Sequence, residues 1–415
     1  MPLPDHWWRL YDDSRLDDLV VEALAANDDL RAAEANIRAA TAVVEQAKAA
    51  RTPVTSLAGG LSYGQDGIPT PSASGFLYSI AGSVTYPVDL FGGLRRGIEA
   101  AQDSAEATVA ARDQVRVVVA AGVTRSFVAA CAANRSYAAA SKVLAIQQHT
   151  LDTVERLFHG GRATAFDVSR AQAAVDQSAA LLPGFVATRR SAVYQLAALL
   201  GRPPGEFPVV ADQCTSPPSL SQPIPVGSGD ALLRRRPDIR AAERDLAAAT
   251  ASIGVSVAQL YPAISLGGQA ASAAPFALFG SNSSVSFSVG PLVTWSFPNR
   301  RVIRAEIARA GAGADAAAAN FDATVIEALR ETETAVSNYA YQLDNESALQ
   351  RARAAAATAS EQAERLYQFG RTDFINVLSA ESALANADAA LSQSAAVLAD
   401  DQAAVFQSLG GGWQP

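Results

Sequence analysis

The sequence predicts a mainly α-helical protein with a membrane β-barrel part, built by duplication of one unit. Two segments 209 positions apart, Leu157–Val175 and Leu366–Leu384, carry identical residues at the same spacing, and each joins two alanine-rich runs. Other stretches alternate apolar and small polar residues, which is typical of strands. Two further runs contain no proline for more than sixty residues, which predicts helices too long for a compact domain.

The composition excludes several classes of protein. The net charge is −8, so the chain lacks the basic surface of a nucleic-acid-binding protein. Cys131 and Cys214 have neither a metal-site spacing nor a disulfide framework, and we expect spectator thiols. His6, His149 and His159 are scattered, and no catalytic triad, paired carboxylate or phosphate loop occurs. We therefore expect no enzyme activity, no cofactor and no metal site.

The duplication sets the predicted domain boundaries. The offset of 209 also relates Asp29–Glu34 to Asp238–Glu243 and Leu200-Gly201 to Leu409-Gly410. A connector rich in proline, serine and glycine separates the copies. The predicted parts are an N-terminal segment (1–27), a first repeat (28–201), the connector (202–236), a second repeat (237–410) and a tail (411–415).

Each copy has the same predicted order: helix, hairpin, long helix, tip, return helix. The opening helices are 28–50 and 238–259, and Pro53 or Pro262 follows each. The long helices, 94–158 and 302–369, would each span about 100 Å. The tips are 158–166 and 367–375. At each tip a glycine with positive φ would end one helix, and Thr164 or one of Thr372 and Asp373 would cap the next. The return helices run over 165–200 and 374–409.

The predicted strands are 54–63 and 76–90 in the first copy and 263–271 and 284–297 in the second. Residues 262–297 contain no charged side chain, and Arg95-Arg96 and Arg300-Arg301 follow the two strand regions. This pattern favours a barrel wall in lipid, with the arginines and Trp295 at the membrane interface, over a soluble sandwich with one buried face.

Four strands cannot close a barrel, and open edges are not tolerated in lipid. We therefore expect oligomerisation. Three chains would supply twelve strands, whereas two would supply eight, a barrel filled by side chains. No run of about 18 apolar residues is present, so no transmembrane helix is predicted. The first residues do not form a signal peptide, which leaves a cytosolic protein or a mature form without its leader.

Several local sequences carry a resemblance to a known family. They are the opening WWRLYDDSRLDDLVVEALAANDDLRAAEANI, the midpoint IPVGSGDALLRRRPDIRAAERDLAAA, the sequence LFGGLRRGIEAA after the first strands, and the terminal LGGGW. With these, nearly the whole chain resembles the TolC-like outer-membrane factor family, in particular its lipoprotein efflux branch. The resemblance implies a homotrimer with a 12-stranded β-barrel in outer-membrane lipid and a long periplasmic α-helical barrel. It also implies a lipid anchor on a cysteine ahead of the present sequence.

The resemblance assigns a periplasmic gate to the tips. Tyr367 and Asp167 match the inter-tip tyrosine and aspartate of the family by motif position. Arg371 lies one residue from a tip arginine of some members, and Arg162 is its equivalent in the first copy. Asn376 and Ser379 stand where some members carry acidic rings, and Asp373 is a possible substitute. Each of these side chains could instead be an ordinary cap or surface residue.

The resemblance also implies a function. The chain would be the passive exit duct of a tripartite efflux pump, receiving small toxic compounds through a periplasmic adaptor from an inner-membrane pump, for which the resistance–nodulation–division type is expected. One alternative within the same fold is an exit duct for type I protein secretion. The other is a non-transporting elongated coiled coil with a soluble sheet.

Overall fold

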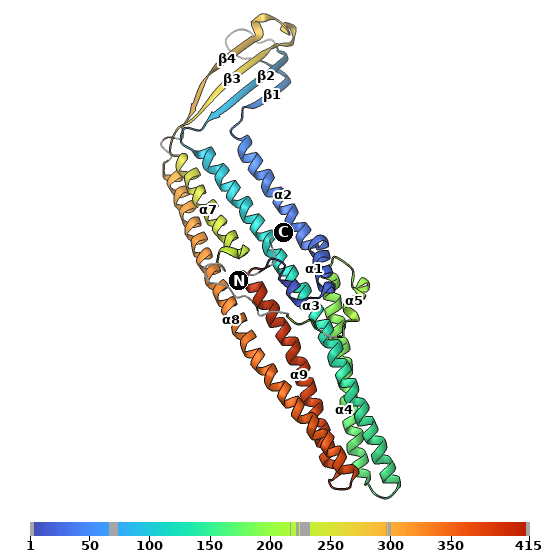
Figure 1. Cartoon of the computed structure of the whole chain (residues 1–415). Coiled ribbons are helices and arrows are strands. Elements are labelled where there is room, and N and C mark those ends of the chain that lie inside the picture. The colour runs from blue at the N-terminus through green and yellow to red at the C-terminus, as the bar shows by residue number, and fades with distance from the viewer. Residues whose placement is uncertain are drawn as a thin grey trace. The chain divides into compact units, whose positions relative to one another are not determined.

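The computed structural model describes residues 4–65, 74–215, 217–220, 224, 233–295, 297 and 300–411. The chain is mainly helical and contains one four-stranded sheet (Figure 1). It divides into two compact units, which are described separately. The helical unit comprises Met1–Glu34, Ala111–Ile239 and Val325–Pro415, and the sheet unit comprises Ala35–Ala110 and Arg240–Thr324.

The helices follow the duplicated order that the sequence predicts. The two longest, α3 and α8, have 67 and 69 residues, so each spans about 100 Å. Their bounds lie within two residues of the predicted ones. The helices are α1 (Ser14–Ala26), α2 (Asp28–Ala49), α3 (Gly93–His159), α4 (Ala165–Leu199), α5 (Val209–Asp212), α7 (Pro237–Ala258), α8 (Arg300–Gln368) and α9 (Phe374–Ser408). Short 3₁₀ helices are η1 (Trp7–Tyr11), η2 (Pro204–Glu206), η3 (Phe276–Leu278) and η4 (Asn282–Ser284).

The sheet has the order β1-β2-β3-β4, and every neighbouring pair is antiparallel. Its strands are β1 (Val54–Gln65), β2 (Ser74–Val88), β3 (Ala263–Pro275) and β4 (Val285–Thr294). The predicted hairpins, β1 with β2 and β3 with β4, are present. The sequence did not show that β2 of the first copy pairs with β3 of the second, from Leu77↔Pro275 to Val88↔Ile264. This pairing accounts for the extension of β3 past the predicted end at 271.

The core of the helical unit lies where the N-terminal segment meets both copies. Trp7 and Trp8 are almost completely buried, and Trp7 stacks on Phe406 of α9 with ring centroids 4.5 Å apart. The same buried cluster includes Phe127 of α3 and Leu196 of α4. Burying large apolar side chains contributes roughly 1.5–3 kcal/mol each. The segment before α2 therefore joins helices of the first copy to a helix of the second.

Both copies contain the same joint between the end of the return helix and the start of the opening helix. In the first copy, the side chain of Asn27 donates to the carbonyl of Leu199 and accepts from the first backbone N–H groups of α2. In the second copy, Arg236 occupies the position equivalent to Asn27. It is 5% exposed and donates to the carbonyl of Ser408. Asn27 is thus the cap of α2.

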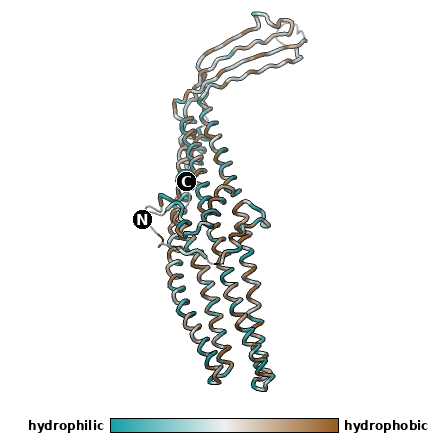
Figure 2. The backbone as a smooth tube through the Cα atoms, turned by 45° about the vertical axis from the view of Figure 1, so that its right-hand side comes forward, coloured by the Kyte–Doolittle hydropathy of each residue, from teal (hydrophilic) through white to brown (hydrophobic). Residues whose placement is uncertain are grey.

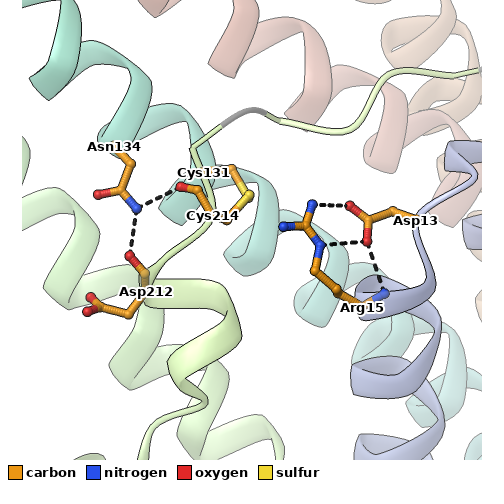
Figure 3. The surroundings of a disulfide bond; sticks show 6 residues. All are labelled: Asp13, Arg15, Cys131, Asn134, Asp212 and Cys214. Atoms are coloured by element: carbon orange, nitrogen blue, oxygen red, sulfur yellow. Dashed lines mark hydrogen bonds and ion pairs between the residues drawn. A yellow bond between two sulfur atoms is a disulfide. The ribbon is translucent and has the colours of Figure 1, made fainter.

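The two cysteines correct one expectation from the sequence. Cys131 of α3 and Cys214, just after α5, form a disulfide across a sequence separation of 83 (Figure 3). The side-chain amide of Asn134 donates to the carbonyls of Asp212 and Cys214 and holds the connector beside the bond. The prediction of spectator thiols was wrong, because the spacing of two cysteines along the sequence does not show whether the fold brings them together in space. A disulfide is typical of an oxidising compartment.

The expectation that the chain has no transmembrane helix bears on α3 in particular. Among the described residues, α3 contains an 18-residue window that is long and apolar enough to cross a membrane by length and composition alone. Two thirds of that window is buried inside the molecule. A core helix of this kind satisfies the same criterion, so the window by itself does not indicate a membrane helix.

The disulfide should stabilise the fold. Replacing Cys131 and Cys214 with serine should lower the free energy of unfolding by about 2–4 kcal/mol, because the 83-residue loop is no longer closed in the unfolded chain. Denaturant unfolding of the full-length protein, followed by tryptophan fluorescence, measures the change. A reducing agent should lower the midpoint of the parent protein and leave that of the double variant unchanged. An unchanged midpoint in a parent protein whose cysteines are shown to be reduced would contradict the prediction.

Candidate functional site

The two tips have nearly identical backbone geometry. Gly161 and Gly370 have φ of +69° and +64°, so each ends a long helix in the left-handed region. The backbone N–H of Arg162 donates to the carbonyl of Leu157, and that of Arg371 donates to Leu366. This is the helix-ending pattern that glycine permits. The tips lie side by side at one end of the helical unit (Figures 1 and 2).

The first tip is closed by a reciprocal pair of caps. The hydroxyl of Thr164 accepts from the backbone N–H of Asp167, and the carboxylate of Asp167 accepts from the backbone N–H and the hydroxyl of Thr164. The hydrogen bonds from Thr164 hold the pKa of the Asp167 carboxyl below its ordinary value. Thr164 is the cap that the sequence predicted, and Asp167 shares that task.

The second tip lacks this arrangement. Asp373 occupies the N-cap position of α9, but its side chain makes no capping hydrogen bond. The side-chain amide of Asn376 donates instead to the hydroxyl of Thr372, 2.9 Å away. The two copies therefore share a backbone turn and differ in the side chains that follow it.

Charges of the first tip act on a tyrosine of the second. Burial raises the pKa of the Tyr367 hydroxyl, the Asp167 carboxylate raises it further, and the Arg162 guanidinium opposes both. The ring of Tyr367 lies 5.6 Å from that of Phe374. The structure thus brings three of the gate candidates, Tyr367, Asp167 and Arg162, within electrostatic reach of one another.

The sheet unit has one strongly apolar face. The register places most of the large apolar side chains of the four strands on the same side of the sheet. Val289 is 87% exposed and Phe287 is 85% exposed. Figure 2 shows brown and pale positions alternating along the strands. The exposed members of this apolar face are Leu57, Leu61, Tyr63, Phe76, Ile80, Val84, Tyr86, Leu266, Val285, Phe287, Val289 and Val293.

The opposite face of the sheet is formed mainly by small side chains. Ser56 and Ser83, on neighbouring strands, hydrogen-bond through their hydroxyls at 2.8 Å. Val54, Leu77 and Leu292 are the large apolar exceptions, and Leu292 lies over Gly267, where a Cβ atom would be 2.6 Å from it. The four strands as described contain no charged residue. A solvent-facing sheet would normally carry lysine and glutamate, whereas a barrel wall in lipid alternates apolar and small polar positions.

The arginines after the strands begin the two longest helices. Arg95 and Arg96 lie in the first turn of α3, and Arg300 and Arg301 begin α8. Neither first turn contains an acidic residue, although α2 and α7 begin with aspartates. Arg96 forms an ion pair with Glu99 one turn along α3. A cation at a helix N-terminus opposes the helix dipole, so the dipole does not explain the placement of these arginines.

Two other groups complete this junction in the sheet unit. The carboxylate of Asp89 accepts from the backbone N–H groups of Leu94 and Arg95 and caps α3. The indole N–H of Trp295 donates to the carbonyl of Leu260 at 3.3 Å, and half of the Trp295 side chain remains exposed. An amphipathic ring with one polar end is typical of a membrane–water interface.

Among the described residues, no group of three histidine, cysteine, aspartate or glutamate side chains could hold a metal ion. The sequence reasoning missed two buried acidic residues, Asp113 of α3 and Glu381 of α9. Glu381 of α9 is 7% exposed, and its position in an alanine-rich helix with two other small polar neighbours gave no signal that it would be buried.

Comparison with known proteins identifies the family. The family model described as "Outer membrane efflux protein" matches residues 19–202 and 229–411, one stretch in each copy, and the chain belongs to this family. Nodulation protein T of Rhizobium leguminosarum bv. viciae is 28% identical over 409 residues, which cover 98% of this chain and 84% of that protein. The cation efflux system protein CusC of Escherichia coli is 26% identical over 413 residues, covering 98% and 88%.

Solved structures agree with this assignment. The outer-membrane channel OprN is 34% identical and superposes with a TM-score of 0.94, covering all of this chain and 94% of OprN. VceC of Vibrio cholerae, at 23% identity, shares the fold with a TM-score of 0.91 and complete coverage of both chains. The protein is therefore an outer-membrane efflux channel of this family, which is a family of ducts and not of enzymes.

Proposed function

We propose that three copies of this chain assemble into one outer-membrane exit duct with a 12-stranded barrel. The observation that carries the proposal is the sheet, whose apolar face is exposed and whose outer strands β1 and β4 each pair on one side only in the described structure. Unpaired backbone groups cost several kcal/mol each in lipid, so the edges need partners. Pairing β1 of one chain with β4 of the next satisfies both edges, and three chains leave a water-filled interior.

The arginines and Trp295 support the position of the membrane boundary. Arg95, Arg96, Arg300 and Arg301 lie just after the apolar strands, where the helix dipoles disfavour them. Anionic headgroups would compensate for that cost. In this arrangement Trp295 belongs to the aromatic belt at the same level. Outer-membrane lipid is thus the partner of the apolar face.

The duct would work passively within a tripartite efflux pump. Because the family is one of ducts, energy would come from an inner-membrane pump through a periplasmic adaptor, and the resistance–nodulation–division type is the expected pump. Relatives are named for cation efflux, pyoverdine export and toluene efflux. Because these cargoes differ chemically, we propose small toxic compounds as a class and assign no single substrate.

The tips would form the periplasmic gate of this duct. The electrostatic influence of Asp167 and Arg162 on Tyr367 supports a contact between the two copies' tips. Arg371, Asp373 and Asn376 lie on the second tip, where Asp373 makes no capping hydrogen bond and Asn376 is held by Thr372. The asymmetry between the copies allows one tip to bind the other.

The sheet proposal predicts a strong difference between two adjacent positions. Val289→Arg, on the apolar face of β4, should cost up to about 2–4 kcal/mol near the membrane midplane and reduce assembly in the outer membrane. Ser288→Arg, on the small polar face, should assemble normally. The amount of heat-modifiable protein in the outer-membrane fraction measures both. Equal assembly of the two variants would mean that this face does not contact lipid.

The same strains test efflux. Cells lacking the chain should be hypersensitive to toxic small molecules, and the parent chain should restore resistance while Val289→Arg should not. If cells lacking the chain keep their normal sensitivity but retain inside the cell a polypeptide that the parent strain exports, the secretion duct is favoured.

The gate proposal predicts that Asp167→Ala and Tyr367→Phe raise single-channel conductance in planar bilayers, because each removes a contact that holds the tips together. Thr164→Ala is the matched control, since it removes the cap of α4 and keeps the Asp167 carboxylate. Its conductance should stay close to that of the parent channel. If Thr164→Ala raises conductance as much as Asp167→Ala, Asp167 acts only as a cap.

A further inference from the structure

A buried acid joins the two copies between the tips and the core of the helical unit. The hydroxyl of Thr150 on α3 donates to Oε1 of Glu381 on α9 at 3.0 Å. The side chains of Arg125 and Asp400 form an ion pair between the same two helices, on the side away from the tips. If the two copies separated from the tips upward, the Thr150–Glu381 hydrogen bond would therefore break before the Arg125–Asp400 ion pair.

The surroundings of Glu381 disfavour its charged form. Its second oxygen, Oε2, is buried and has no hydrogen-bond partner among the described residues. Burying an ionised carboxylate without a partner costs much more than burying the neutral acid. Burial raises the pKa of Glu381, the carboxylate of Glu364 on α8 raises it further, and the hydrogen bond from Thr150 opposes both.

Several cations of the helices α3 and α8 are paired with other acids. On α8, Arg353 pairs with Asp388 of α9, and Arg365 forms an ion pair with Glu361. On α3, Arg156 pairs with Asp152, and His149, beside Thr150, is exposed. The charged group that acts on Glu381 from the helices around it is therefore another acid, Glu364.

We propose that Glu381 is a proton-operated latch between α3 and α9: the neutral acid stays buried against Thr150 and holds the copies together, and ionisation releases it. A carboxyl group whose pKa is higher in the packed state stabilises that state below its ordinary pKa, and this stabilisation is lost as the pH rises through the raised value. Acid therefore favours packed helices, and a rise in pH favours separation. The inference deepens the proposed gate, because separation of α3 from α9 near the tips would widen it.

The test measures the distance between α3 and α9 directly. Because the chain's two cysteines form the disulfide, Gln148→Cys and Ser382→Cys, both at exposed positions, can carry spin labels in the full-length protein. Pulsed electron paramagnetic resonance on labelled chains diluted with unlabelled ones gives the distance distribution. We expect a short, narrow distance at a low pH, at or below the ordinary pKa of a glutamate, and a longer or broader one at a high pH, above the raised pKa of Glu381.

Two variants identify the group responsible. Glu381→Gln cannot ionise and can still accept the hydrogen bond from Thr150, so its distance should stay short at both pH values. Glu364→Gln removes the neighbouring negative charge, so its transition should move to lower pH. A parent protein whose distance does not change with pH, or a Glu381→Gln variant that keeps the parent's transition, would overturn the latch. The distance reports on the helices whether or not the chain conducts, so this result is independent of the proposed function.

Discussion

The unsatisfied edges of the sheet are the constraint on which the account depends. The chain contributes four antiparallel strands with one exposed apolar face, and the central pairing of β2 with β3 joins the two copies into a single sheet. Such a sheet is unsuited to water because of its apolar face, and unsuited to lipid while β1 and β4 lack outer partners. In the proposed assembly, pairing β1 with β4 of a neighbouring copy would satisfy the sheet edges, and lipid would cover the apolar face.

Much of this fold could be predicted from local sequence signals. Glycines at the tips, prolines after the opening helices and strict alternation in the strands each act on a few neighbouring residues, and the bounds of α3, α4, α8 and α9 follow from them. Contacts between distant residues could not be predicted in this way. The Cys131–Cys214 disulfide, the β2–β3 register and the burial of Glu381 depend on how helices and strands meet in space, which spacing along one copy does not encode.

The duplication explains the framework, and the differences between the copies explain the candidate site. The joint that uses Asn27 in the first copy uses Arg236 in the second, and both donate to the last carbonyls of a return helix. At the tips the backbones remain alike, while Thr164 and Asp167 cap one helix and Asp373 leaves the other without a side-chain cap. This difference in side chains is the basis of the proposed contact between the tips. Glu381 likewise differs from its equivalent in the first copy, the exposed Gln172.

The central claim is that three chains close one barrel. Native mass spectrometry counts the chains directly, using the full-length protein extracted from the outer membrane and released from detergent micelles. The account predicts a single species with three times the 43.1 kDa mass of the chain. A stable monomer or dimer, under conditions where the protein retains its folded heat-modifiable form, would contradict it.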